Sequence, residues 1–206
     1  MSDFYVGYAS TPPRTKALML TLAPLLVLLA AGVGLLLSTE QAGTGEGQWL
    51  TSAVATIEGR LVAEPYPAIL IPNEAGGAPE TVFLSTVAKM VPTDRMQGLI
   101  GRDVAADGIL VERDGRRLLA VNDGDSAIRA AEGISGEARL DIEPIGAQTL
   151  RGEIIDPKCW YGVMKPGEGK THKACATLCL FGGIAPLFKT VGPAGQELVY
   201  VLTNAD

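Results

Sequence analysis

Three cysteines and the single histidine of the chain lie close together near its C-terminal end. Cys159, His172, Cys175 and Cys179 fall within 21 residues of a chain that has 206. Thiolate and imidazole groups are the ligands that zinc and copper(I) prefer in proteins, and four of them complete a tetrahedral shell. These residue types indicate a Cys3His site for zinc or copper, with the thioether of Met164 in the intervening loop as a fifth candidate ligand.

The spacing of three of these residues predicts that they share one face of a helix. A glycine-rich loop precedes a run of good helix formers that starts at His172, and a pair of glycines is suited to end that run. Cys175 and Cys179 follow His172 by three and seven residues, and such positions lie on the same side of a helix. Cys159 is expected at the end of the preceding strand, from which its sulfur can face this helix.

The cysteines also allow a different chemistry. In an oxidising compartment two of them can form a disulfide and leave one thiol free. A bond from Cys159 to Cys175 or Cys179 would join the loop to the helix, whereas a bond between Cys175 and Cys179 has a marginal Cα separation within a regular helix. Buried, unreactive thiols are the third interpretation.

Four lysines lie near the cysteines in the sequence, namely Lys158, Lys165, Lys170 and Lys173. Their positive field would favour thiolates and help either metal binding or thiol chemistry. A solvated loop explains these lysines equally well.

A longer motif surrounds the cysteines and the histidine. It reads GEIIDPKC over 152–159, HKACATLC over 172–179 and GGIAP over 182–186. This motif resembles one found in uncharacterised bacterial proteins that are membrane-anchored or secreted. The resemblance implies that these residues act together as one site, and it names no activity.

An uncharged stretch of 21 residues near the start of the chain predicts a membrane anchor. It runs from Ala17 to Leu37, and a helix of that length spans roughly 30 Å, the hydrocarbon thickness of a bilayer. Arg14 and Lys16 precede it, so the positive-inside rule places the N-terminus in the cytoplasm. We expect a single-pass protein of the bacterial inner membrane with a periplasmic C-terminal domain. A cleaved signal peptide is the alternative, although the apolar core is long and no convincing cleavage site follows it.

The rest of the chain alternates short apolar stretches with turn signals, which is typical of β structure. Asp114-Gly115 between two apolar stretches is a strong hairpin signal. We predict a mainly β protein with one or two small OB-like β-barrel or sandwich units, the second of which has a short Cys/His-bearing helix. The predicted organisation is a cytoplasmic tail (1–16), a transmembrane helix (17–37), a flexible tether (38–50), an OB-like β domain (51–128), a linker (129–147) and a second β unit with the Cys/His site (148–206).

Composition narrows the function. The net charge of −6 and the low aromatic content of 5% argue against a nucleic-acid partner, because phosphate binding needs clustered basic residues. Neither a phosphate loop, a dinucleotide fingerprint nor a nucleophile elbow is present in the sequence, so we assign no catalytic residue and favour a non-enzymatic role.

These features lead to one main hypothesis and two alternatives. The main hypothesis is a membrane-tethered periplasmic metal-binding protein that serves as an accessory or electron-transfer subunit of a respiratory complex or metalloenzyme. Its expected partners are the lipid bilayer and another membrane or periplasmic protein subunit. The alternatives are a thiol–disulfide redox protein and a non-catalytic scaffold with a structural disulfide.

Overall fold

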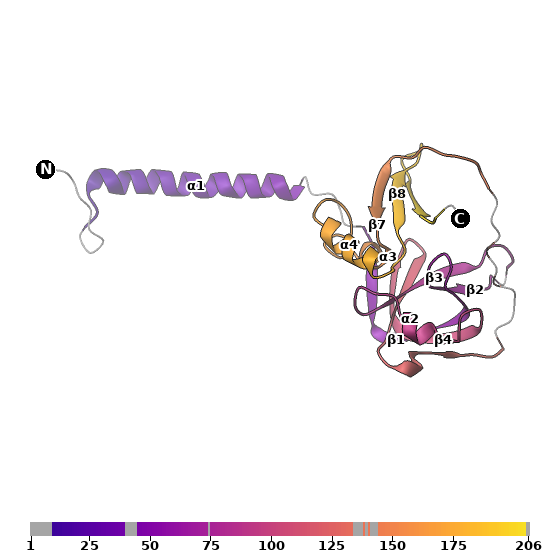
Figure 1. Cartoon of the computed structure of the whole chain (residues 1–206). Coiled ribbons are helices and arrows are strands. Elements are labelled where there is room, and N and C mark those ends of the chain that lie inside the picture. Colours follow the sequence, from indigo (N-terminus) through magenta and orange to yellow (C-terminus); the bar gives the residue numbers. More distant parts are fainter. Residues whose placement is uncertain are drawn as a thin grey trace. The chain divides into compact units, whose positions relative to one another are not determined.

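The computed structural model describes residues 10–39, 45–73, 75–133, 138, 140 and 144–204. The chain divides into two compact units, Met1–Gly43 and Thr44–Asp206 (Figure 1). The first unit contains a single long helix, and the second contains the strands and the cysteines.

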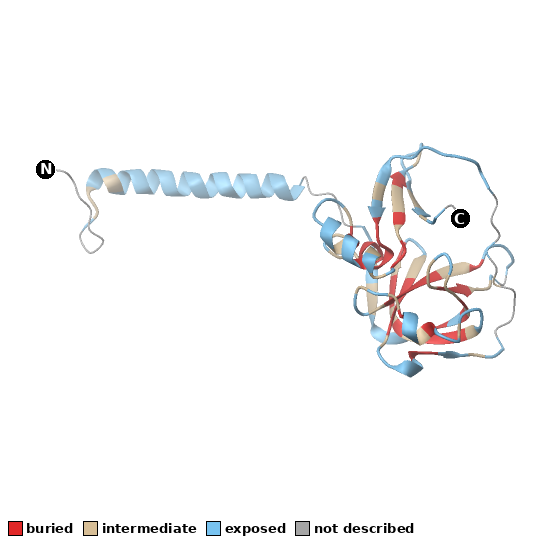
Figure 2. Cartoon of the chain, in the orientation of Figure 1, coloured by how far each residue is buried: buried red, intermediate tan, exposed pale blue. Residues whose placement is uncertain are grey.

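Helix α1 (Pro13–Thr39) makes up the described part of the first unit. None of its side chains is buried (Figure 2), and an 18-residue window within it has a mean hydropathy of 2.5. The helix is therefore long and apolar enough to cross a membrane, a property that signal sequences share. It begins at Pro13, earlier than expected, because proline is well tolerated in the first turn of a helix. Residues 1–9 of the expected cytoplasmic tail lie outside the described part of the chain.

A closed five-stranded β-barrel forms the larger part of the second unit. Its strands are β1 (Gln48–Val62), β2 (Ala68–Ile71), β3 (Glu80–Thr86), β4 (Asp103–Arg113) and β5 (Arg116–Val121). Their order is β1-β2-β3-β5-β4, and β4 pairs with β1 to close the barrel. The pairing of β3 with β5 is parallel and the other four are antiparallel. This order is consistent with the OB-like barrel that we predicted from the sequence.

Shorter elements complete the barrel. Helix α2 (Thr93–Met96) follows β3, the 3₁₀ turn η1 (Asp125–Ala127) follows β5, and β6 (Ile128–Ala130) pairs with the edge of β4. The barrel encloses a core of aliphatic side chains that includes Leu61, Ile69, Val82, Val104 and Leu119.

Glycines shape the barrel at two places. Asp114 and Gly115 both have a positive φ, and they form the tight hairpin between β4 and β5 that the Asp-Gly pair predicted. Gly59 lies in β1 where a Cβ atom would overlap the carbonyl oxygen of Leu70 in β2. A residue without a side chain therefore lets the long strand β1 approach β2 closely while it also pairs with β4.

A three-stranded antiparallel sheet lies against the barrel. It consists of β7 (Gly152–Ile155), β8 (Leu187–Val191) and β9 (Glu197–Val201), and the chain between β7 and β8 forms α3 (Pro157–Tyr161) and α4 (Lys173–Phe181). Sheet, helix and barrel share a second core, in which Ile155, Trp160 and Leu187 pack against Phe83 and Leu118. Within the described residues, the second predicted β unit is thus a sheet on the barrel wall and belongs to the same compact unit.

Two predicted connections differ from the structure at their ends. The tether expected at 38–50 is shorter, because α1 extends to Thr39 and β1 already begins at Gln48. Residues 40–44 of this tether lie outside the described part of the chain. The linker expected at 129–147 begins within β6, and its residues 134–137, 139 and 141–143 are likewise outside the described ranges.

Candidate metal centre

Helix α3 positions the first cysteine and begins at an Asp-Pro pair. Asp156 occupies the N-cap, where its Oδ1 accepts a hydrogen bond of 2.9 Å from the backbone N–H of Cys159, and Pro157 occupies the first helical position. The prediction that Cys159 ends a strand is therefore wrong, since β7 stops at Ile155 and Cys159 lies in the helix that follows. An aspartate before a proline was the sequence signal for this helix.

Helix α3 is held firmly against the barrel. Trp160 is fully buried, and the guanidinium of Arg113 lies 4.1 Å from the centre of its indole ring. The same guanidinium donates a hydrogen bond of 3.1 Å to the Trp160 carbonyl. Because Arg113 ends β4, the barrel itself fixes the position of Cys159.

Helix α4 carries the other two cysteines. It spans Lys173–Phe181, so His172 lies at its N-cap and not within its first turn, as the sequence had suggested. Cys175 and Cys179 are one turn apart, and Cys179 is fully buried while Cys175 is half-buried.

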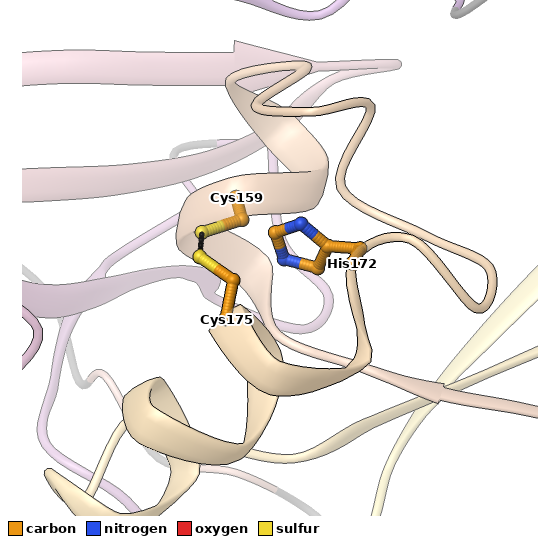
Figure 3. A group of neighbouring side chains, drawn as sticks. All are labelled: Cys159, His172 and Cys175. Carbon is orange, nitrogen blue, oxygen red and sulfur yellow. Dashed lines mark hydrogen bonds between the residues drawn. The ribbon is translucent and has the colours of Figure 1, made fainter.

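The three sulfur atoms meet between α3 and α4. Cys159 Sγ lies 3.7 Å from Cys175 Sγ (Figure 3) and 3.8 Å from Cys179 Sγ, and all three thiols are free. A tetrahedral zinc ion with Zn–S bonds of about 2.3 Å separates two of its sulfur ligands by about 3.8 Å. Cys159 Sγ is therefore spaced from each of the other two sulfur atoms as two ligands of one metal ion would be.

His172 joins this group from the N-terminus of α4. One of its ring nitrogens lies within 4.8 Å of the sulfurs of Cys159 and Cys175. The ring is buried, its Nε2 lies 3.3 Å from Asp156 Oδ2, and its Nδ1 has no hydrogen-bond partner among the described residues. An imidazole that a carboxylate orients through one nitrogen and that leaves the other unpartnered is a common form of metal ligand.

Asp156 is a polar group at the site that the sequence did not point to. Its side chain is fully buried, and one of its oxygens also lies within 4.8 Å of the sulfurs of Cys159 and Cys179. Its two oxygens thus cap α3 and orient the imidazole, and the carboxylate lies close enough to offer an oxygen ligand.

Lys89 comes to the site from a distant part of the sequence. Its Nζ lies 2.6 Å from Cys175 Sγ and 3.8 Å from Cys179 Sγ. The residue belongs to the connection between β3 and α2, and no local motif in that connection points toward the cysteines. Only the tertiary fold brings the Lys89 ammonium to the cysteines.

Lys158 holds the segment that carries Lys89. Its side chain is buried, and its Nζ donates to the carbonyls of Thr86, Val87 and Ala88 at 2.6, 2.7 and 2.5 Å. Sequence analysis placed Lys158 among the lysines that surround the site as a source of positive field, and the structure gives it this anchoring role as well.

The other end of the same segment rests on α4. The Val91 N–H donates a hydrogen bond of 3.0 Å to the Gly182 carbonyl, and a Cβ on Gly182 would overlap the carbonyl oxygen of Lys89. Glycine at the end of α4 therefore serves the contact with the 86–91 segment as well as the helix end.

Charge at the site is divided unequally among the side chains. The hydrogen bond between the Cys159 and Cys179 thiols, together with burial, raises the pKa of Cys159 well above its usual value. The same bond lowers the pKa of Cys179. The bond to Cys175 raises the pKa of Lys89, whereas burial lowers the pKa of Lys158. Cys179 is therefore the sulfur that carries negative charge more readily than Cys159.

Four of the five residues predicted as ligands lie in two overlapping groups, each with its potential ligand atoms within 4.8 Å of one another. Cys159, His172 and Cys175 form one group, and Cys159 and Cys179 form the other together with Asp156. Met164 lies at the margin, where its side chain packs against the buried cluster of Cys159, Cys179 and Ile184. Its role as a ligand stays a prediction.

Comparison of the chain with models of protein families, with curated proteins and with solved structures gives no match.

Proposed function

We propose that this protein is a membrane-tethered metal-binding protein whose site holds zinc or copper through Cys159, His172, Cys175 and Cys179. The observation that carries the proposal is the position of Cys159 Sγ, at 3.7 and 3.8 Å from the two sulfurs of α4. Three thiols and an imidazole form a soft ligand set of the kind that suits both metals.

The surroundings of the ligands support this assignment. Asp156 orients His172 through a buried contact, and Lys89 supplies a positive charge that offsets part of the charge of three thiolates. Burial of Cys159, Cys179 and His172 excludes water from most of the ligand shell. Such preorganisation lowers the cost of ordering the ligands around an ion.

The wider role is also a proposal. An apolar helix of sufficient length supports a single-pass anchor in the bacterial inner membrane, and the basic residues before it support a periplasmic location for the cysteines. A soft metal site on an OB-like barrel would suit an accessory or electron-transfer subunit of a respiratory complex or metalloenzyme. Its partners would be the bilayer and another membrane or periplasmic subunit.

Metal analysis of the full-length protein in detergent tests the proposal. After loading with zinc or copper(I) and removal of excess ion, we expect one metal per chain, lost in Cys159→Ser and Cys175→Ser. Ala174→Ser is the matched control, because it adds the same hydroxyl at an exposed position of α4. A wild-type protein that retains no metal under these conditions would refute the proposal.

A second candidate function is thiol–disulfide exchange. Cys159 Sγ is almost equally far from both sulfurs of α4, and closing either gap to a bond of about 2.0 Å releases two electrons and two protons to an oxidant. Thiol titration of protein purified without a reductant separates the two functions. Two thiols missing from the titration favour exchange, whereas three titratable thiols with bound metal favour the metal site.

A further inference from the structure

Access to the cysteine cluster is uneven, and Cys175 is its exposed side. Cys159 and Cys179 are fully buried and His172 is 1% exposed, whereas Cys175 is half-buried. A ligand can exchange without unfolding of the site only where an incoming group can reach the ion. Among the four ligands, Cys175 alone meets this condition.

Lys89 contacts the cluster on that side. Its Nζ contacts Cys175 Sγ at 2.6 Å and reaches Cys179 Sγ at 3.8 Å, and the lysine is itself half-buried. The Lys89 ammonium is therefore in direct contact with the ligand that can exchange.

The position of Lys89 is fixed by contacts that begin within the site itself. Lys158, next to Cys159 in α3, binds three consecutive carbonyls of the 86–88 segment, and Gly182 at the end of α4 binds Val91 beyond it. Both helices that carry the cysteines thus hold the segment that carries Lys89. These contacts on both sides of Lys89 restrict its position, unlike that of a freely moving surface lysine.

We infer that Cys175 is the exchange ligand of the metal centre and that Lys89 is the positioning residue that promotes its release. When Cys175 leaves the ion, the electron pair of the metal–sulfur bond stays on the sulfur. A donor atom of the incoming ligand supplies the pair for the new bond, and no oxidant or reductant is required. The ammonium offsets the charge of the departing thiolate through a hydrogen bond and keeps its own protons. This inference rests on the metal binding proposed above and makes the site one that delivers its metal to an external thiolate or nitrogen ligand.

Zinc release from the full-length protein in detergent tests the inference. Zinc-loaded protein is mixed with a large excess of a chromophoric zinc chelator, and the rate of colour formation is recorded. We expect Lys89→Met to slow release about tenfold, the scale of one hydrogen bond to a charged group. Lys89→Arg keeps a cation at this position and should remain close to the wild-type rate.

Lys173→Met is the matched control, because it removes an exposed lysine from the same helix as Cys175. Equal release rates for Lys89→Met and Lys173→Met, with one zinc bound to each, would overturn the inference and leave the proposed metal binding intact. A wild-type protein that binds no zinc would overturn both.

Discussion

Replacement of Asp156 tests how the proposed metal centre is built, because this buried carboxylate contacts two neighbours at once. Its Oδ1 caps α3 at the N–H of Cys159, and its Oδ2 contacts Nε2 of His172. Asp156→Ala removes both contacts. Loss of an N-cap costs about 1 kcal/mol, and a buried ring nitrogen left without a partner costs about 1–3 kcal/mol. We expect the free energy of unfolding of the metal-free protein to fall by about 3 kcal/mol.

Asp156→Asn separates the two roles. Asparagine is as good an N-cap as aspartate, so most of the stability should be retained. The carboxylate that orients His172 is lost, and loss of such a partner typically weakens metal affinity about 10- to 100-fold. Denaturant unfolding of the full-length protein in detergent measures the first quantity, and competition with a zinc chelator measures the second.

Asp125→Asn is the control, since Asp125 is exposed in the barrel turn after β5. It should change stability by less than about 0.5 kcal/mol. The reasoning would be refuted if Asp156→Asn bound zinc as tightly as this control, or if Asp156→Ala unfolded at the same denaturant concentration as the wild type.

Three further predictions follow from buried and charged contacts. Lys158→Met strips three carbonyls of their donor and should cost at least about 2 kcal/mol in denaturant unfolding, whereas the exposed Lys165→Met should be nearly neutral. Arg129 holds the pKa of Asp107 below its ordinary value of 3.8, so the small stability that this exposed pair contributes is present above that pH and lost as the pH falls further. Arg129→Gln should therefore flatten the acid limb of the stability curve. In metal-free native protein iodoacetamide should modify Cys175 first, as peptide mass analysis would show, and the two buried thiols should react only on unfolding.

Much of the architecture could be predicted from local patterns. The long uncharged stretch from Ala17 to Leu37 predicted α1, because an apolar segment of this length is typical of a helix that can span a bilayer. Alternating short strands predicted a small barrel, and Asp114-Gly115 predicted the hairpin between β4 and β5, since these turns need residues that tolerate a positive φ. The closing of β4 onto β1 was beyond such patterns, because it joins residues far apart in the chain.

Local patterns also predicted which residues cluster as candidate ligands. They did not predict the residues that contact this cluster. Cys159, His172, Cys175 and Cys179 stand within one short stretch, and helical spacing alone suggested that the last three face one way. The short helix that carries Cys159 was missed, although the Asp-Pro pair before it marks a helix start.

What the sequence by itself determined is an apolar helix long enough to cross a membrane and a cluster of three thiols and one imidazole, each encoded by neighbouring residues. Only the tertiary structure decided which groups surround that cluster. Lys89 lies 86 residues from Cys175 along the chain, and it reaches the sulfur because the barrel brings the connection after β3 against α3 and α4. Contacts of this kind depend on strand pairing and on buried carbonyls that need a donor. Neither can be recognised from the pattern of neighbouring residues.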